Sequence, residues 1–455
     1  FGEQFAHVIG YVGRINETEL KAIDTAAYRA TTHIGKIGVE KAREEILRGK
    51  VGYQQVEVNA QGRVLRVVTD SPPTPGHDVY LTLDVGLQKM ATQALTDNNG
   101  AIVALDPATG EVLAFVSQPS FDPNLFVNGI SKDRYNTLRN SRDRPLFNRA
   151  LQAQYPPGST IKPMVALAGL ESGVRHSNDH TWCPGWYSLE RHNHRYRDWL
   201  KSGHGQVNLV RSIAESCDVY YYALARDLGI ARIHSMLSEF GLGKVTGIDL
   251  PGETAGLLPS AEWKRKARNL PWYPGETLIT GIGQGFMLTS PLQLAYAVST
   301  IANRGRRMVP HVVGQIEDPV ARVASAIGIY ERPVIEITNA QYWDDVINGM
   351  LEVVHGTRGT ARRSGDGAFY RYAGKTGTAQ LFGIAQDTVV KNHETPKLLR
   401  DHALFIAFAP EKNPEIAVAI IVENGGSGSD TAAPIARQIL DYYLLSSRSA
   451  SDNDG

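Results

Sequence analysis

The stretch that decides the fold reads Tyr155-Pro156-Pro157-Gly158-Ser159-Thr160-Ile161-Lys162-Pro163-Met164-Val165-Ala166-Leu167-Ala168-Gly169-Leu170. Two prolines and a glycine mark a loop, and the apolar residues after them recur with helical spacing. The pattern predicts a buried helix that starts near Ser159. Pro163 is compatible with its first turn, because the N–H groups there have no helical partner. Ser159 and Lys162 then share one helix face.

This spacing fits nucleophilic catalysis by serine. A serine hydroxyl becomes a good nucleophile when a neighbouring base takes its proton. A buried lysine can be that base, because burial lowers its pKa. Ser159 is the only serine with a lysine three residues on. A capping serine beside an exposed lysine has the same spacing, so the interpretation depends on the rest of the chain.

Length and composition indicate a globular protein with a large core and two domains. The chain has 455 residues, 42% of them hydrophobic and 21% charged. Its 47 basic and 47 acidic residues cancel, so neither nucleic acid nor an acidic membrane surface is predicted as a partner. The sequence holds no apolar run long enough to span a bilayer. We therefore expect a soluble protein, or one whose anchor lies upstream of Phe1.

The chain divides into three predicted regions. Residues 1–75 form a small N-terminal unit, in which Val51 to Val68 alternates like a hairpin around the turn Asn59-Ala60-Gln61-Gly62. The Pro-rich stretch Ser71 to Gly76 is the expected linker. Residues 76–446 form the main domain, and the polar residues 447–455 are predicted to be a disordered tail.

The main domain is predicted to have an α+β fold. Strands are expected near both of its ends, and the middle of the domain is mostly helical, so both ends should join one antiparallel sheet with flanking helices and an all-α subdomain. The expected strands are Gly100–Leu105, Val112–Ser117, Tyr372–Thr378, His402–Ala409 and Ile416–Glu423, and a final helix spans Ala432–Leu445.

Ser216-Cys217-Asp218 is the second candidate motif. It lies in Val210–Leu224, whose periodicity is helical. A hydroxyl there can shuttle a proton to a leaving group, with a carboxylate beside it. An ordinary polar turn has the same composition, and Ser177-Asn178-Asp179 repeats it. We prefer Ser216, because Ser177 follows the nucleophile too closely in a polar loop.

Lys375-Thr376-Gly377-Thr378, at the end of a predicted strand, is the third motif. Gly377 is expected to let a substrate backbone approach closely. Lys375, Thr376 and Thr378 offer a cation and two hydroxyls to a carboxylate. The Thr378 N–H can also point at an oxyanion. Lys201-Ser202-Gly203 is a weaker match, because no strand surrounds it.

The order S-x-x-K, S-x-D, K-T-G-T resembles that of the penicillin-recognising serine enzymes. Gly281-Ile282-Gly283-Gln284-Gly285 and Thr289-Ser290-Pro291-Leu292-Gln293-Leu294-Ala295 are similar to stretches of high-molecular-mass penicillin-binding proteins. Gly35–Gly62 resembles the pedestal, or dimerisation, domain of class B members, and no class A glycosyltransferase module is found. An aspartate at 218 and the Cys183-Pro184-Gly185-Trp186 stretch are similar to the elongation-type members of Gram-negative rods.

The resemblance implies a peptidoglycan D,D-transpeptidase. Ser159, deprotonated by Lys162, would attack the carbonyl between the two terminal D-alanines of a stem peptide. The N–H groups of Ser159 and Thr378 would hold the oxyanion. An amine of a neighbouring stem would then take the acyl group. β-Lactams mimic the D-Ala-D-Ala end and would leave a slow acyl-enzyme.

The other motif residues also receive roles from the resemblance. Ser216 would pass a proton to the departing D-alanine while Asp218 orients that region. Thr376 and Thr378 would bind the terminal carboxylate near Lys375. Two alternatives remain open: a hydrolase of β-lactams or D-Ala-D-Ala peptides (a β-lactamase or carboxypeptidase), and a receptor that is acylated once.

The resemblance further implies a cellular setting. It places the catalytic domain in the periplasm, held at the inner membrane by a single anchor upstream of Phe1. The implied partners are a membrane-embedded SEDS-type glycosyltransferase and proteins of the elongation complex, which maintains rod shape. No organic cofactor is implied.

Cys183, Asp198, His204 and Cys217 fall within 35 residues and form a plausible tetrahedral zinc set. Four protein ligands leave no open position, so the metal would be structural. On a helix, the Cys217 side chain would point away from the substrate. A Cys183–Cys217 disulfide and two unpaired buried thiols are the alternatives, and His192 or His194 could replace His204.

Overall fold

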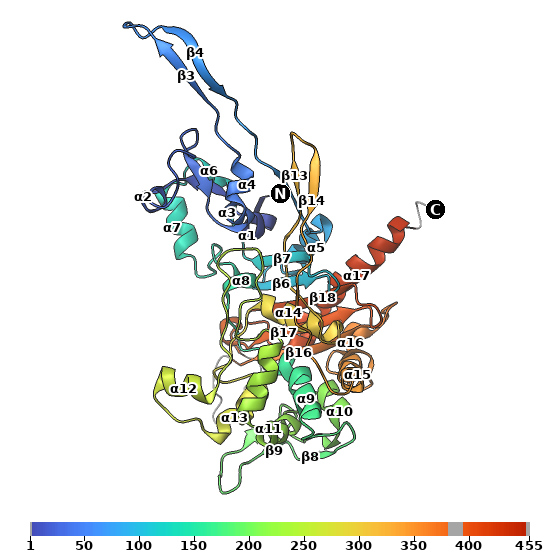
Figure 1. Cartoon of the computed structure of the whole chain (residues 1–455). Helices are drawn as coiled ribbons and strands as arrows, with labels where there is room; N and C mark the ends of the chain where they lie inside the picture. The colour runs from blue at the N-terminus through green and yellow to red at the C-terminus, as the bar shows by residue number, and fades with distance from the viewer. Residues whose placement is uncertain (1, 381–394, 452–455) are drawn as a thin grey trace.

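The computed structural model describes residues 2–380 and 395–451 (Figure 1). Its centre is a five-stranded antiparallel sheet in the order β16-β17-β18-β6-β7. The strands are β6 (Gly100–Leu105), β7 (Val112–Gln118), β16 (Ala373–Ala379), β17 (His402–Ala409) and β18 (Ile416–Val422). The predicted α+β fold is confirmed, with both ends of the domain joined in one sheet.

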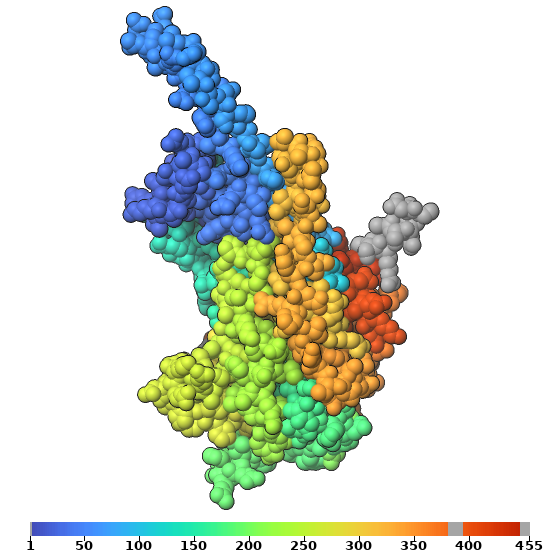
Figure 2. All heavy atoms as spheres, viewed as in Figure 1, coloured from blue at the N-terminus to red at the C-terminus, as the bar shows by residue number. Residues whose placement is uncertain are grey.

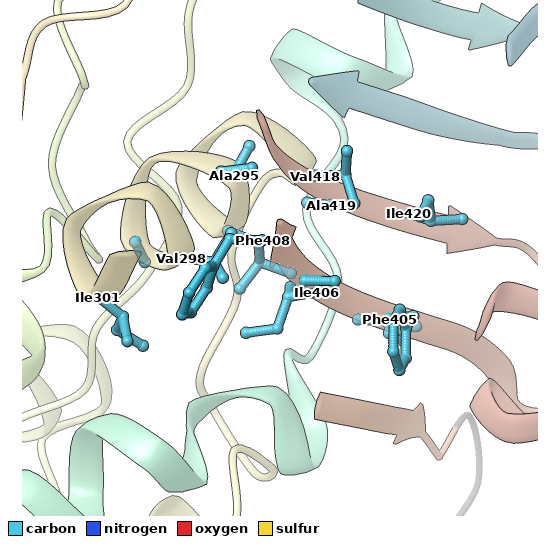
Figure 3. Close-up of a cluster of buried hydrophobic side chains, with 14 of the residues drawn as sticks. Ala295, Val298, Ile301, Phe405, Ile406, Phe408, Val418, Ala419 and Ile420 are labelled. Carbon is cyan, nitrogen blue, oxygen red and sulfur yellow. The ribbon is translucent and has the colours of Figure 1, made fainter. Parts of the chain in front are cut away.

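Helices cover both faces of this sheet. Every residue of β18 is buried, as is every residue of β17 except His402, which explains their continuous apolar sequence. Helix α14 (Pro291–Ala302) packs on one face, and α5 (Val85–Ala94) and α17 (Ala433–Ser451) on the other. Figure 3 shows Val298 of α14 beside Phe408 of β17.

The middle of the chain forms the all-α part. Helix α9 (Lys162–Glu171) is buried from Lys162 to Leu170, because α11 (Asp218–Glu239) and α15 (Gln341–His355) pack around it. The predicted buried helix is therefore present, but its first turn, Gly158–Ile161, is a 3₁₀ helix. The other helices of this part include α10 (Leu209–Ala214), α12 (Ala261–Arg268), α13 (Pro274–Thr280) and α16 (Arg362–Gly365).

The N-terminal unit is built from short elements and one long hairpin. The hairpin is present as predicted, with the turn at residues 59–62, and projects from the molecule (Figures 1 and 2). Two short helices, separated at Arg43, precede the hairpin. The elements are α1 (Ala6–Ile9), β1 (Val12–Arg14), α2 (Glu17–Leu20), β2 (His33–Gly35), α3 (Gly38–Ala42), α4 (Glu44–Arg48), β3 (Tyr53–Val58) and β4 (Val64–Ser71).

The N-terminal unit is packed against the main domain. Val8 and Val39 are part of the same hydrophobic core as the central sheet. Arg43 forms a 3.0 Å ion pair with Asp249, whose carboxylate also accepts the N–H groups of Val312 and Val313. Side-chain contacts thus link the two regions in addition to the Pro-rich linker.

The end of the chain differs from the predicted tail. Helix α17 continues to Ser451, where disorder was expected from residue 447. An established helix adds one hydrogen bond for each residue it orders, so it can extend into a polar stretch. Among the residues that the structure describes, no helix is both long and apolar enough to cross a membrane.

His7 supplies a pH-dependent prediction for the junction between the two regions. It is 5% exposed and contacts Phe121 edge-on, with 5.3 Å between ring centroids. Burial lowers the pKa of His7 to about 4. The unfolded chain, with an ordinary pKa of about 6.5, therefore binds more protons between pH 6.5 and 4, and stability falls as the pH falls through this window.

Replacing the histidine should remove this dependence. Between pH 7 and pH 5 the wild type should lose about 2 kcal/mol more unfolding free energy than His7→Phe, measured by denaturant titration. His192→Phe, at an exposed histidine, is the control and should keep the wild-type pH profile. Equal losses in wild type and His7→Phe would contradict the assignment.

Candidate active site and metal group

The turn that carries Ser159 is held by close backbone contacts. In its 3₁₀ geometry residues three apart are eclipsed, so Ser159 and Lys162 face the same way. Gly158 has φ +54°, and a Cβ there would lie 2.6 Å from the Thr378 carbonyl oxygen. A Cβ at Gly283 would lie 2.2 Å from the Gly158 carbonyl oxygen. Glycines at both positions let three distant segments meet at the nucleophile.

A buried polar network anchors the loop before this turn. Tyr155 exchanges two backbone hydrogen bonds with Thr289, and its hydroxyl donates to Glu423 at 2.7 Å. Arg149, only 3% exposed, pairs with the same carboxylate at 3.0 Å. Sequence reasoning missed Glu423 and Arg149. Neither lies in a motif, and a charged pair at a strand end is ordinary.

Four predicted residues converge at the centre of the site. Lys162 is fully buried, and its Nζ donates to Asp218 Oδ1 at 2.7 Å and to the Ser216 carbonyl oxygen at 2.8 Å. Ser216 Oγ lies 3.3 Å from Lys162 Nζ and 2.9 Å from Lys375 Nζ. Within the described residues the Ser159 hydroxyl donates no hydrogen bond. The Ser216 hydroxyl therefore lies between the amino groups of two lysines.

The second motif was predicted to lie within one helix, but it lies between two. Helix α10 ends at Ala214, and α11 begins at Asp218. Between them Ser216 has φ +57°, a conformation that costs a non-glycine residue energy and that concentrates at functional sites. Cys217 is the N-cap of α11. This tight turn points the Ser216 hydroxyl at both lysines, which a continuous helix would not do.

Burial shifts the pKa values of two charged groups here. Burial lowers the pKa of Lys375 well below its usual range, the charge of Lys162 adds to this, and Asp218 opposes it. Burial also raises the pKa of Asp218, against the attraction of Lys162. A carboxylate bound beside Lys375 would favour the charged lysine. The site is therefore suited to an anionic ligand.

The third motif lies on β16 as predicted. Thr376 Oγ1 is 2.9 Å from Thr360 Oγ1, and the Thr378 carbonyl oxygen accepts from Gln284 Nε2 at 3.0 Å. A Cβ at Gly377 would lie 2.7 Å from the Thr160 side chain. This glycine thus allows β16 to pack against the turn that carries Ser159, and the close approach of a substrate backbone to it stays a prediction.

The four predicted metal ligands also come together. The candidate donor atoms of Cys183, Asp198, His204 and Cys217 all lie within 4.8 Å of one another. Cys183 Sγ is 3.5 Å from Asp198 Oδ2 and 3.6 Å from His204 Nδ1, and Cys217 Sγ is 3.4 Å from Asp198 Oδ2. Donors of a tetrahedral zinc site lie about 3.5 Å apart. Both cysteines are free and buried.

The ionisation of two members of this group suits a cation, whereas the hydrogen bond to Cys183 and burial raise the pKa of Cys217 and favour its thiol form. The pKa of Cys183 is lowered to about 6 by its hydrogen bonds to Cys217 and His204. Burial raises the pKa of Asp198, but hydrogen bonds from His204 and from the Leu200 and Val219 N–H groups outweigh it and hold the value at about 2. Thiolate and carboxylate are the forms that bind zinc. The residues present therefore fit the metal.

One residue joins the two sites. Trp199, next to Asp198, donates its N–H to Asp218 Oδ2 at 3.2 Å and its indole N–H to the Glu215 carbonyl oxygen at 3.0 Å. Asp198 itself accepts the Val219 N–H at 3.1 Å. The metal group and the second motif therefore share the start of α11. The sequence alone did not indicate this role for Trp199.

Comparison with known proteins identifies the class. Residues 100–441 match the penicillin-binding protein transpeptidase domain, and residues 1–81 match the penicillin-binding protein dimerisation domain. The chain belongs to the penicillin-binding protein transpeptidase family. Within it, the likeness is to class B members of the PBP2 type.

The individual relatives are close over the whole chain. Peptidoglycan D,D-transpeptidase MrdA of Acinetobacter baumannii is 46% identical over 98% of this chain, which spans 65% of that relative's length. The structure of Pseudomonas aeruginosa PBP2 in complex with WCK 5153 is 48% identical, with a TM-score of 0.85 over 98% of this chain and 89% of that one. A complex of PBP2 and MreC from Helicobacter pylori is 33% identical, with a TM-score of 0.87 over 98% and 78%.

Asp218→Asn should slow acylation of the protein by a labelled penicillin about tenfold. Asp218 accepts hydrogen bonds from both Lys162 and the Trp199 N–H, and an amide can accept at only one of its two heavy atoms. Asp227→Asn is the control, because Asp227 lies on the same helix but pairs with Arg175 and Arg226. An acylation rate within twofold of wild type would show that the carboxylate is dispensable.

Proposed function

We propose that this chain is the catalytic part of a peptidoglycan D,D-transpeptidase of the elongation type. The observation that carries the proposal is the Ser216 hydroxyl between Lys162 and Lys375, beside the turn that bears Ser159. The transpeptidase named among its relatives supports the same activity. Its substrates are stem peptides that end in D-Ala-D-Ala, and β-lactams are its inhibitors.

The proposed acylation starts with Ser159, which loses its proton to Lys162 and attacks the penultimate D-alanine carbonyl. The N–H groups of Ser159 and Thr378 stabilise the oxyanion. Lys162 is held by Asp218, so as substrate binds it must leave one proton on that carboxylate, whose pKa burial raises, and turn its neutral amine to Ser159. The Ser159–carbonyl bond forms, and the peptide C–N bond breaks.

Ser216 protonates the leaving amine. Its hydroxyl donates a proton to the departing D-alanine and is resupplied through Lys162 and Lys375, which both contact it. Thr376 and Thr378 bind the terminal carboxylate beside Lys375. The amine of a second stem then attacks the ester carbon, which releases Ser159 and completes the crosslink.

Ser159→Ala should abolish covalent labelling by a penicillin, measured by intact mass spectrometry, without loss of thermal stability. Alanine is well tolerated at an accessible helical position, so the fold should survive. Ser202→Ala, at an exposed serine in the weaker match Lys201-Ser202-Gly203, should be labelled as fully as wild type. Label that persists on Ser159→Ala would refute the nucleophile.

The alternative activities can be distinguished by measurements on the same protein preparation. A transpeptidase should join two stem peptides when its glycan-polymerising partner is present, and should hydrolyse β-lactams slowly. Turnover of a β-lactam at more than a few cycles per minute would favour a hydrolase. A single acylation without crosslinking would favour a receptor.

We also propose one structural zinc ion at Cys183, Asp198, His204 and Cys217. The donor atoms lie at zinc-like separations, and all four positions are protein ligands, which is the pattern of a structural site. Zinc would neutralise the charge of the group and hold the turn at Ser216. It takes no part in the acyl transfer.

Protein purified without chelator should contain about one zinc per chain. His204→Ala should lower both the zinc content and the melting temperature, because it removes one ligand of a closed site. His192→Ala, at an exposed histidine, is the control. A metal-free protein with both thiols oxidised would decide for the disulfide instead.

The cellular setting completes the proposal. Residues 1–75 serve as a pedestal and docking unit, and residues 76–446 as the transpeptidase domain. A membrane anchor upstream of Phe1 holds the chain at the inner membrane, with these residues in the periplasm. The partners are a SEDS-type glycosyltransferase and elongation proteins, as the PBP2–MreC complex suggests.

A further inference from the structure

A cavity of about 290 Å³ lies next to the second motif. Its lining residues are Val210, Arg211, Ala214, Glu215, Glu352, Thr357, Arg358 and Gly359. Glu215 immediately precedes Ser216. Gly359 immediately precedes Thr360, whose hydroxyl is 2.9 Å from that of Thr376. Two of the residues that line the cavity are therefore direct chain neighbours of Ser216 and of Thr360, the contact of Thr376.

The two arginines that line this cavity differ in how many hydrogen bonds and ion pairs they form. Arg211 is largely engaged within the protein, because it pairs with both oxygens of Glu215 and also donates to the carbonyl oxygens of Gln206 and His204. Arg358 has a side chain that is 69% exposed, and its one ion pair within the described residues is a loose 3.9 Å contact with the same Glu215. Arg358 is thus the cation available to a ligand.

The backbone holds Arg358 in this place. A Cβ at Gly359 would lie 2.3 Å from the carbonyl oxygens of both Glu352 and Val353, so only glycine lets the loop pass the end of α15. The Thr360 N–H donates to the Ala214 carbonyl oxygen at 3.2 Å. These contacts tie the loop to both α15 and α10, and Arg358 lies at the rim between them.

The reaction needs a site for a second substrate on this side. In the proposed acylation, the departing amine receives its proton from Ser216. The incoming amine performs the reverse of that step, so it must arrive beside Ser216 too. A carboxylate on its amine-bearing carbon would occupy the place of the departed D-alanine carboxylate at Thr376. The rest of the acceptor then extends past Thr376, toward Thr360 and the cavity.

We propose that this cavity is the subsite for the acyl acceptor and that Arg358 binds a carboxylate on the acceptor's side chain. The acceptor class is thus an amine that carries a second, more distant carboxylate. Glu352 also lines the cavity and would repel an anion, so Arg358 is the group in the lining to which the acceptor's carboxylate can bind. The inference rests on the proposed function and adds the substrate that completes it.

The bond changes are those of an aminolysis. The neutral amine nitrogen forms a bond to the ester carbon of the acyl-enzyme, and the bond from that carbon to Ser159 Oγ breaks. One amine proton passes by way of Ser216 to the Ser159 oxygen. Arg358 touches neither bond, so it selects and places the acceptor and is a positioning residue.

The test measures how a preformed acyl-enzyme divides between added amines. The chain is acylated at Ser159 by a thioester analogue of the donor peptide and is offered D-glutamate or D-glutamine, and then D-α-aminoadipate or its side-chain amide. Each pair differs only in side-chain charge. The wild-type acyl-enzyme should react faster with the acid than with the amide in at least one of the two pairs, which differ in side-chain length. Arg358→Gln should reduce that preference about tenfold, as for loss of one charge-assisted hydrogen bond.

Controls separate this role from a general loss of activity. Arg363→Gln, at an exposed arginine outside the cavity lining, should keep the preference, and Arg358→Lys should keep part of it. Acylation of Arg358→Gln by a β-lactam should stay within twofold of wild type. If wild type forms no Ser159 acyl-enzyme, the proposed function fails. If it does, but acid and amide are used equally or the preference survives in Arg358→Gln, only the cavity assignment is overturned.

Discussion

The fully buried ammonium group of Lys162 is the constraint on which the centre of this molecule depends. A buried charge must be paired and hydrogen-bonded, because an isolated one costs several kcal/mol or more. Asp218 supplies the opposite charge at 2.7 Å, and the Ser216 carbonyl oxygen supplies a second acceptor at 2.8 Å. The carbonyl comes from the turn between α10 and α11 and the carboxylate from the first residue of α11, so the left-handed conformation of Ser216 persists because it satisfies Lys162. The same turn places the Ser216 hydroxyl against Lys375, which brings β16 into the network.

On the other side of the site, the turn that carries Ser159 is positioned first by close backbone contacts at two glycines. Gly158 and Gly283 allow the nucleophile turn to touch the Thr378 carbonyl and the loop after α13. Gln284 closes this contact with a 3.0 Å hydrogen bond to the Thr378 carbonyl oxygen. Farther back, Arg149 and Glu423 hold Tyr155, four residues before Ser159. The nucleophile is therefore positioned by segments from five parts of the chain, and an error in any of these contacts would move it relative to both lysines.

Three functions meet around the short turn from Glu215 to Asp218. Cys217 faces the proposed zinc group, Ser216 contacts Lys162 and Lys375, Asp218 pairs with Lys162, and Glu215 lines the proposed acceptor cavity. Successive residues can point in three directions because the turn is neither helix nor strand. Trp199 binds the turn from outside, through Asp218 and the Glu215 carbonyl. These contacts explain how an irregular, strained segment can keep its geometry without a regular element to support it.

The sequence by itself determined the class of fold, the hairpin, the buried helix and the three motifs, because each depends on local periodicity or on residues close together in the chain. It also picked out the four members of the metal group, since thiol, imidazole and carboxylate side chains so near one another are uncommon. It could not show that the second motif breaks a helix, because the helical periodicity of 210–224 continues across a turn that is stabilised by Lys162, 54 residues away. Nor could it show that Arg149 pairs with Glu423, that Trp199 donates a hydrogen bond to Asp218, or that a cavity lies beside Arg358. Those pairings join charges and backbone groups from distant segments, and only the tertiary structure decides which of many ordinary polar residues share one buried space.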